Sequence, residues 1–284
     1  MGLAWPTAAR AHGDLHDQIE ALSREIEKEP RSADLWLRRG ELHRAHGEYD
    51  PAQADYEQAL ALDPKLIAVY LARGRMFVEA NWPVSAKAAL DRYLDRHPDH
   101  VDARTLRARA LVKLKQYLAA AKDYSHAIDK STPPKPDTYL ERADALKAAG
   151  SAYYAEAVRG LDEGLRRLGP VVTLQLYAID LEAKQGRFDA ALARLDRAAA
   201  QANRQETWLA RRGEILRDAG RLPEARRAWQ QALEEIAKLP SARRNVPAML
   251  ELEKALRAAL EVTATQASPG TNAPPATAPA LSRP

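Results

Sequence analysis

Three pairs of histidines have a spacing that could place two metal ligands on one face of a helix. The first pair, near the amino terminus, has no third partner. The repeat register described below puts His43 in a packed position and His46 in an exposed one, and the third pair flanks a connector. We therefore expect these side chains to serve structure or solvent contact, with no metal site. The pairs are His12 and His16, His43 and His46, and His97 and His100.

The sequence contains no motif that would support catalysis. Phosphate-binding glycine loops, zinc-protease helices and nucleophile elbows are all missing. There are no cysteines, which excludes disulfides, thiolate ligands and a cysteine nucleophile. Pairs of Asp and Glu are abundant, but on such highly charged helices they are typical of solvated faces. We expect a protein that is not an enzyme and that needs no cofactor.

The composition of the 284 residues predicts an all-α protein. Ala, Leu, Arg and Glu, which are strong helix formers, dominate the sequence. The net charge is +4, but 43 basic and 39 acidic residues are interleaved along the chain. Nucleic-acid binders usually gather their basic residues into one stripe, so we expect no nucleic-acid partner. No apolar stretch approaches the roughly 20 residues of a membrane span.

An internal repeat organises these residues. Residues 34–42 read DLWLRRGEL and residues 207–215 read TWLARRGEI. The same template recurs between them at steps of 34 to 36 residues, with one extra residue near Pro133 and two near Tyr153. Its first small residue falls at Gly40, Gly74, Ala108, Ala143, the bulkier Ile179, and Gly213. Its turn residue falls at Gly47, Asn81, Lys115, Gly150, Gly186 and Gly220. Its second small residue falls at Ala52, Ala86, Ala120, Ala157, Ala191 and Ala225.

This pattern of small, aromatic and closing proline positions resembles the tetratricopeptide repeat (TPR) family over residues 33–239. Tyr93 and the missing closing prolines of repeats five and six depart from it. The resemblance implies a right-handed α-solenoid of about six helix-turn-helix repeats, each with a helix A such as 33–46 and a helix B such as 50–62. No repeat can bury its apolar face alone, so neighbouring repeats must stack.

The two ends of the repeat array should be closed by capping helices. Residues 14–31 carry apolar residues at helical spacing and predict an amino-terminal cap. Residues 241–262 predict a carboxy-terminal cap. Residues 263–284 are rich in Pro, Ala and Thr and are expected to form a disordered tail.

Residues 1–13 form a leader with two interpretations. Ala9-Arg10-Ala11 has the small-x-small form of a signal-peptide cleavage site, but the apolar stretch is short and no basic segment precedes it. The leader is either the remnant of an export signal or an ordinary leader, and the first interpretation slightly favours an exported or periplasmic location.

The resemblance also implies that helix A of each repeat lines a concave groove that binds a partner protein or peptide. By register, this groove contains Leu37, Glu41, Arg44, Leu71, Arg75, Val78, Thr105, Arg109, Val112, Leu140, Asp144, Lys147, Leu176, Asp180, Ala210, Glu214 and Arg217. Arg75 and Arg109 make its centre basic, and Asp144, Asp180 and Glu214 make its far half acidic. The expected function is an adaptor that binds a peptide or helix with apolar anchors. The alternative is an accessory subunit that positions an enzyme.

Overall fold

The computed structural model describes residues 7–266, with side chains from 15 to 263, and every element in this range is helical. The chain divides into two compact units, residues 1–181 (unit 1) and 182–284 (unit 2). The α-helices of unit 1 are α1 (Thr7–Lys28), α2 (Ala33–His46), α3 (Tyr49–Leu62), α4 (Ala68–Glu79), α5 (Pro83–Leu94), α6 (Val101–Lys113), α7 (Tyr117–Lys130), α8 (Pro136–Ala149), α9 (Tyr154–Leu168) and most of α10 (Val172–Lys184). Those of unit 2 are α11 (Phe188–Ala199), α12 (Glu206–Asp218), α13 (Leu222–Lys238), α14 (Ser241–Arg244) and α15 (Pro247–Gln266).

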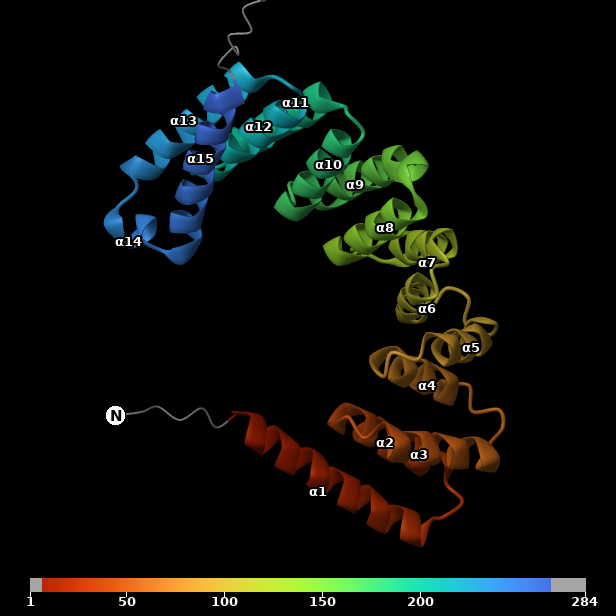
Figure 1. Cartoon of the computed structure of the whole chain (residues 1–284). Helices are drawn as coiled ribbons and strands as arrows, with labels where there is room; N and C mark the ends of the chain where they lie inside the picture. The colour runs from red at the N-terminus through yellow and green to blue at the C-terminus, as the bar shows by residue number, and fades with distance from the viewer. Residues whose placement is uncertain (1–6, 267–284) are drawn as a thin grey trace, which may run out of the picture. The chain divides into compact units, whose positions relative to one another are not determined.

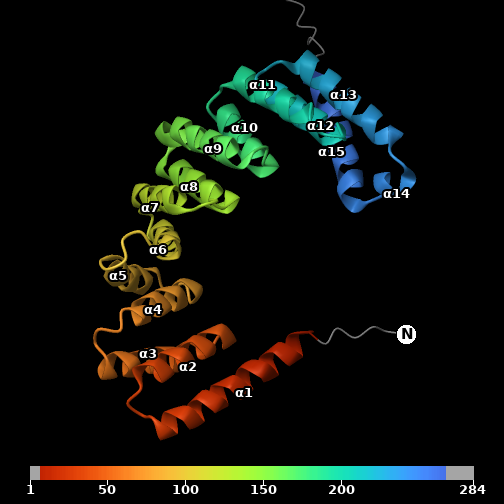
Figure 2. The ribbon, with the colours of Figure 1, turned by 180° about the vertical axis from the view of Figure 1, so that it is seen from behind.

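The fold is an all-α repeat solenoid, as the sequence predicts. In unit 1, α2, α4, α6 and α8 are the A helices of four repeats, and α3, α5, α7 and α9 are their B helices (Figure 1). From α2 to α9, each helix lies beside the next one in the chain in both views (Figure 2). The boundary between the units falls inside α10, in the fifth repeat, where Ile179 takes the position of the first small residue. Within residues 7–266, no helix is long and apolar enough to cross a membrane.

The turns between helix A and helix B use one left-handed residue at the predicted positions. Gly47, Gly186 and Gly220 have φ values of 84°, 72° and 75°, and the non-glycine residues Asn81 and Lys115 have 58° and 59°. Two backbone hydrogen bonds close each turn, for example from Gly47 N to Arg44 O and from Glu48 N to His43 O. This pattern satisfies carbonyl groups that the end of helix A would otherwise leave unpaired.

The fourth repeat turns differently because it contains the two extra residues. Gly150 has φ 126° and ψ 168°, a conformation open essentially to glycine alone. A short 3-10 helix, Ser151–Tyr153, then leads into α9. The insertion is therefore absorbed between the helices, and the pairing of α8 with α9 is kept.

Within a repeat, a small residue on helix A lies against a large residue 16 positions later on helix B. A Cβ atom placed on Gly40 would lie 2.6 Å from the Tyr56 ring, and one placed on Gly74 would lie 2.5 Å from Leu90. Gly213 has the same relation to the Trp229 ring. Tyr56 and Trp229 are almost completely buried. The absent side chain is what lets the larger one fill the space between the helices.

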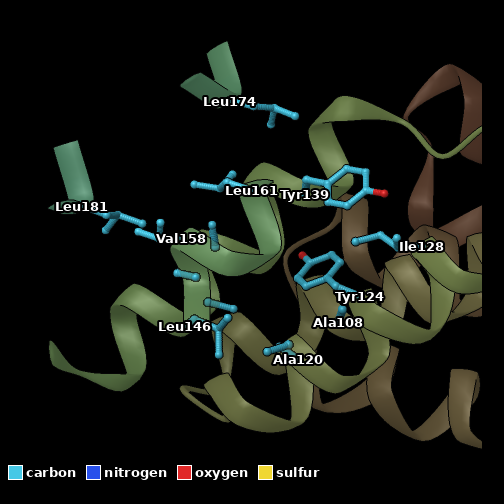
Figure 3. Packing of buried hydrophobic residues seen from close by; sticks show 14 of the residues in the cluster. Ala108, Ala120, Tyr124, Ile128, Tyr139, Leu146, Val158, Leu161, Leu174 and Leu181 are labelled. Atoms are coloured by element: carbon cyan, nitrogen blue, oxygen red, sulfur yellow. The ribbon is translucent and has the colours of Figure 1, made fainter. Parts of the chain in front are cut away.

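The core of unit 1 continues from one repeat to the next. Figure 3 shows Tyr124 of α7 and Tyr139 of α8 at the centre of one cluster, with Ile128 beside them. Leu174 and Leu181 of α10 belong to the same cluster. This cluster runs from Ala108 in the third repeat to Leu181 in the fifth, so it is built by stacked repeats and could not be formed by one repeat alone.

The helices at the two ends extend further than the sequence predicts. The first helix begins at Thr7, not near residue 14, so residues 7–13 of the expected leader are helical. At the other end, α14 and α15 replace a single helix, and α15 continues to Gln266, four residues into the expected tail. Residues 1–6 and 267–284, which hold the rest of the leader and tail predictions, lie outside the described residues.

Both end helices pack on their neighbouring repeats. Leu22 and Ile26 of α1 are buried in one cluster with Leu35 of α2. In unit 2, the Arg226 guanidinium of α13 donates to the Leu260 carbonyl at 2.9 Å and to Thr263 Oγ1 at 3.2 Å on α15. Each end helix therefore contributes to the core of its own unit, as a capping helix would.

Candidate binding surface

The A helices of unit 1 form a surface, here called the A-helix face, that is hollowed by three cavities. The first cavity measures about 590 Å³ and lies among α1, α2 and α4. Its walls include Leu37, Glu41, Leu71 and Arg75 from the predicted groove, and Leu22 from α1. A volume of 300 to 1,000 Å³ is usual for ligand pockets. The cavity is therefore large enough for several side chains of a partner.

The second cavity lies among α4, α6 and the start of α8, and the third lies among α4, the start of α5, α6 and α7. One, of about 300 Å³, is lined by Arg75, Thr105 and Arg109. The other, of about 240 Å³, is lined by Val78, Arg109, Val112 and the half-exposed Trp82. Arg75 belongs to the first and second of the three cavities, and Arg109 to the second and third. The two arginines thus link the three cavities into one row.

The wall formed by α1 was not predicted as part of this surface. Gln18, Ala21 and Glu25 of α1 line the largest cavity together with Leu22. These positions recur every three or four residues, which places them on one face of a helix. The sequence predicted this helix only as a cap, from its apolar residues, and Gln18 and Glu25 do not belong to that apolar pattern.

A hydrogen-bond network centred on Glu41 orders the first part of the face. Tyr56 Oη donates to Glu41 at 2.6 Å, Arg44 lies 3.2 Å from the same carboxylate, and Arg75 lies 3.5 Å from it. Arg44 also bonds Glu79 of the next repeat at 2.7 Å. Burial and the neighbouring Glu41 raise the pKa of the Tyr56 hydroxyl, because both disfavour a second negative charge.

The predicted basic centre is partly neutralised by carboxylates of the adjacent repeats. Arg109 is paired with Glu141 of α8 at 2.9 Å, and about half of its side chain is exposed. The Arg75 guanidinium approaches the Glu41 carboxylate no closer than 3.5 Å. Both guanidinium groups nevertheless line cavities and keep N–H donors that a ligand could use.

Farther along unit 1, the predicted residues belong to a second polar cluster. Asp144 pairs with Lys147 at 2.8 Å and accepts a hydrogen bond from the Tyr177 hydroxyl. Burial, with the nearby Asp144, raises the pKa of Tyr177 to about 12. Leu176 is 38% exposed, whereas Leu140 and Asp180 are half-buried.

In unit 2, the predicted groove residues have unequal exposure. Ala210 is only 5% exposed, so it offers almost no surface to a ligand. Glu214 pairs with Arg211 at 2.5 Å, and Arg217 pairs with Asp218 at 2.8 Å. The small side chain at position 210 serves the packing of α12, which the groove register alone did not reveal.

The histidines of the sequence analysis whose side chains are described, from His16 on, have structural contacts. His43 and His46 both bond Glu48, at 2.6 and 2.9 Å, and these hydrogen bonds hold the pKa of the Glu48 carboxyl below its usual range. His100 accepts a hydrogen bond from the Ala103 amide at the start of α6, and Tyr93 packs against its ring. Among the residues with described side chains, no cluster of three or more His, Asp or Glu could hold a metal ion.

Comparison with protein families assigns the chain to a known class. A tetratricopeptide repeat model matches residues 33–66, a second matches residues 71–136, and a tetratricopeptide repeat-like domain model matches residues 161–251. Together they span more than half of the chain. The chain belongs to the tetratricopeptide repeat family.

Individual relatives are distant. A protein SGT1 homolog from Oryza sativa subsp. japonica is 33% identical over 84 residues, which is 30% of this chain and only 23% of that protein. The C-terminal part of a TPR repeat-containing protein from Cytophaga hutchinsonii superposes with a TM-score of 0.62 at 17% identity, covering 81% of this chain and 93% of that one. A tetratricopeptide repeat protein from Parabacteroides merdae gives 0.52 at 19% identity, covering 89% and 93%. These structures are similar in fold.

Proposed function

We propose that this chain is a non-catalytic adaptor that binds a segment of another protein on the A-helix face of unit 1. The observation that carries the proposal is the row of three cavities joined through Arg75 and Arg109. Their walls combine apolar residues such as Leu37, Leu71 and Val112 with a few charged groups. Apolar pockets with sparse polar groups are typical of sites that bind side chains.

The chemistry of the walls suggests the character of the bound segment. The large cavity suits apolar anchors, because Leu37 and Leu71 face it. Acidic residues of the segment would lie over Arg75 and Arg109, where they could compete with Glu41 and Glu141 for the guanidinium groups. Basic residues would suit Asp144 and Asp180. Glu214 and Arg217 belong to unit 2, and we propose them as a separate contact surface, to which the buried Ala210 contributes little.

The test is an affinity capture from native cells with three forms of the full chain. The first is the wild type, and the second carries Leu71→Asp, Arg75→Glu and Arg109→Glu. The third is a matched control with the same chemical changes at exposed positions outside the A-helix face, namely Leu118→Asp, Arg96→Glu and Arg197→Glu. Circular dichroism melts of all three forms show whether each one is folded.

We expect a partner that the wild type and the control capture and the second form loses. Its binding should weaken as salt is raised, because exposed charge pairs are screened. Capture by all three forms alike would place the binding site elsewhere and contradict the proposal. A short segment that reproduces the binding of the partner supports an adaptor. A stoichiometric enzyme whose activity changes on binding supports the alternative of an accessory subunit.

A further inference from the structure

Ion pairs between a partly buried arginine and a buried aspartate recur between the two helices of a repeat, and the second repeat lacks one. Arg39 of α2 bonds the buried Asp55 of α3 at 2.6 Å, and Arg107 of α6 bonds the buried Asp123 of α7 at 2.6 Å. In both pairs the aspartate follows the arginine by 16 residues. By the same register, Arg73 of α4 should meet residue 89 of α5, but that residue is alanine.

A cavity lies where the missing carboxylate would be. It measures about 250 Å³ and is lined by residues of α4 and α5, among them Arg73, Arg92, Tyr70, Ser85 and Ala89. This volume corresponds to roughly eight water molecules at the packing of the liquid. It is smaller than the pockets that usually hold whole ligands, but it can hold one carboxylate or phosphate group.

The donors around this cavity lack anionic partners. Arg73 Nε is buried without a hydrogen-bond partner, and its guanidinium lies 5.5 Å from the Phe77 ring centre. Arg92 donates to the Tyr70 hydroxyl at 3.1 Å. Within the described part of the chain, neither arginine forms an ion pair with a carboxylate. Leaving a buried donor unsatisfied is unfavourable, so an anion placed here would gain strong, charge-assisted hydrogen bonds.

One acidic residue of the preceding repeat has to be considered as an internal partner. Glu57 of α3 occupies the register position of Asp91, which pairs with Arg107 at 2.8 Å one repeat later. Glu57 instead accepts a hydrogen bond from Gln53 at 2.5 Å and forms no ion pair with Arg73. Arg73 therefore remains available to an external acceptor.

This cavity opens on a different side of α4 from Leu71 and Arg75, although Phe77 borders both it and the third cavity of the row. Leu71 and Arg75 on α4 line the A-helix face, and Arg73 lies two residues from each of them. Two residues correspond to a rotation of about 200° around a helix. Arg73 consequently points away from the row of three cavities, so a ligand bound here would leave the proposed adaptor site open.

We propose that the cavity between α4 and α5 is a binding site for an oxyanion, held by Arg73 and Arg92 with help from the hydroxyls of Tyr70 and Ser85. The bound group takes the place that Asp55 and Asp123 occupy in the neighbouring repeats. Its source is either an acidic side chain of a partner protein or a phosphate group, since both present the same oxygen acceptors to a pair of guanidinium groups.

The experiment titrates the full chain with two probes at constant ionic strength: inorganic phosphate, and a glutamate-containing tripeptide with blocked ends. The Nε–H resonance of Arg73 in a nitrogen-15 spectrum reports binding at this unpaired donor. Sodium chloride serves as the reference salt. Arg92→Gln removes one guanidinium from the exposed side of the site. Ala89→Asp rebuilds the internal carboxylate of the neighbouring repeats. Arg96→Gln and Ala119→Asp are the matched controls at exposed positions.

We expect a saturable shift of the Arg73 resonance with at least one probe and not with chloride. Arg92→Gln should weaken the affinity by about tenfold or more, as expected for the loss of a charged hydrogen bond. Ala89→Asp should abolish binding, whereas both controls should bind like the wild type. The tighter of the two probes identifies the source of the oxyanion.

Two results would contradict the proposal of an oxyanion site. One is a shift no larger with phosphate or the peptide than with chloride. The other is unchanged binding in a folded Ala89→Asp or Arg92→Gln variant. Because Arg92 is exposed, its substitution keeps the test decisive even if Ala89→Asp does not fold.

Discussion

At the scale of single residues, the repeats depend on a few positions where the size or the charge of the side chain cannot change without a large loss of stability. Gly40 and Gly213 are such positions, because the Tyr56 and Trp229 rings occupy the space of their absent side chains. Asp55 and Asp123 are others, since each is buried and neutralises a partly buried arginine. Substitutions at these positions should be far more costly than at exposed sites on the same helices.

Replacing Gly40 by leucine should destabilise the chain by about 1–3 kcal/mol, because the new side chain must displace the Tyr56 ring from a closely packed site. Ala45→Leu, at an exposed position of the same helix, is the matched control and should be close to neutral. Urea denaturation of both variants measures the difference. Equal stability of the two would show that the register assigned to the first repeat is wrong.

Replacing Asp123 by asparagine should cost about 2–4 kcal/mol. Asp123 is 3% exposed and accepts from both Arg104 and Arg107, so its neutralisation leaves two partly buried cations without their main partner. Asp91, whose side chain is 35% exposed, also pairs with Arg107. Asp91→Asn is therefore the control, with an expected loss below about 1 kcal/mol. Similar losses for both variants in urea denaturation would contradict this ranking.

At the scale of secondary-structure elements, the turns were predicted more accurately than the ends of the array. The first repeat was expected as helices 33–46 and 50–62 and is observed as Ala33–His46 and Tyr49–Leu62. These limits are set by local chemistry, namely the left-handed Gly47 and the closing Asp63-Pro64. The end helices lack such signals. The first begins at Thr7 and the last continues to Gln266; neither added stretch contains a proline, and alanine is frequent in residues 7–13 although Gly13 lies among them.

Replacing Lys115 by glycine should stabilise the chain by about 0.5–1 kcal/mol. Lys115 has φ 59°, which costs an L-residue about 1–2 kcal/mol, and glycine removes that strain at a smaller cost in unfolded-state entropy. Lys113→Gly, at the last residue of the preceding helix, is the control and should destabilise by about 0.5–1 kcal/mol. Thermal melts of the two variants should shift in opposite directions. A lower melting temperature for Lys115→Gly would contradict the turn geometry.

At the scale of the whole molecule, the charges are distributed in pairs and not in a field of one sign. Many arginines are bound to carboxylates, both within repeats, as in Arg39 with Asp55, and between repeats, as in Arg44 with Glu79. The net charge of +4 is therefore spread over a surface in which both signs alternate. Such a surface gives little long-range attraction for a polyanion.

The full chain should accordingly show no measurable binding to random-sequence duplex DNA up to about 100 μM protein at 0.15 M salt, where non-specific binders reach dissociation constants of 10⁻⁴ to 10⁻⁶ M. Fluorescence anisotropy of a labelled duplex measures this. Binding with a steep dependence on salt would mean that several lysines or arginines act together on phosphates, against the expected absence of a nucleic-acid partner.

The sequence alone determined the family, the repeat register, the turn residues and the small positions, because each depends on residues within one repeat and recurs at nearly constant spacing. It did not determine the three cavities, the wall that α1 contributes, or the division of the chain inside α10. Nor did it reveal that Glu41 gathers Tyr56, Arg44 and Arg75, or that Arg73 lacks a carboxylate. These features depend on side chains of different helices meeting across 15 to 35 residues, and only tertiary packing decides which of them come within hydrogen-bond distance.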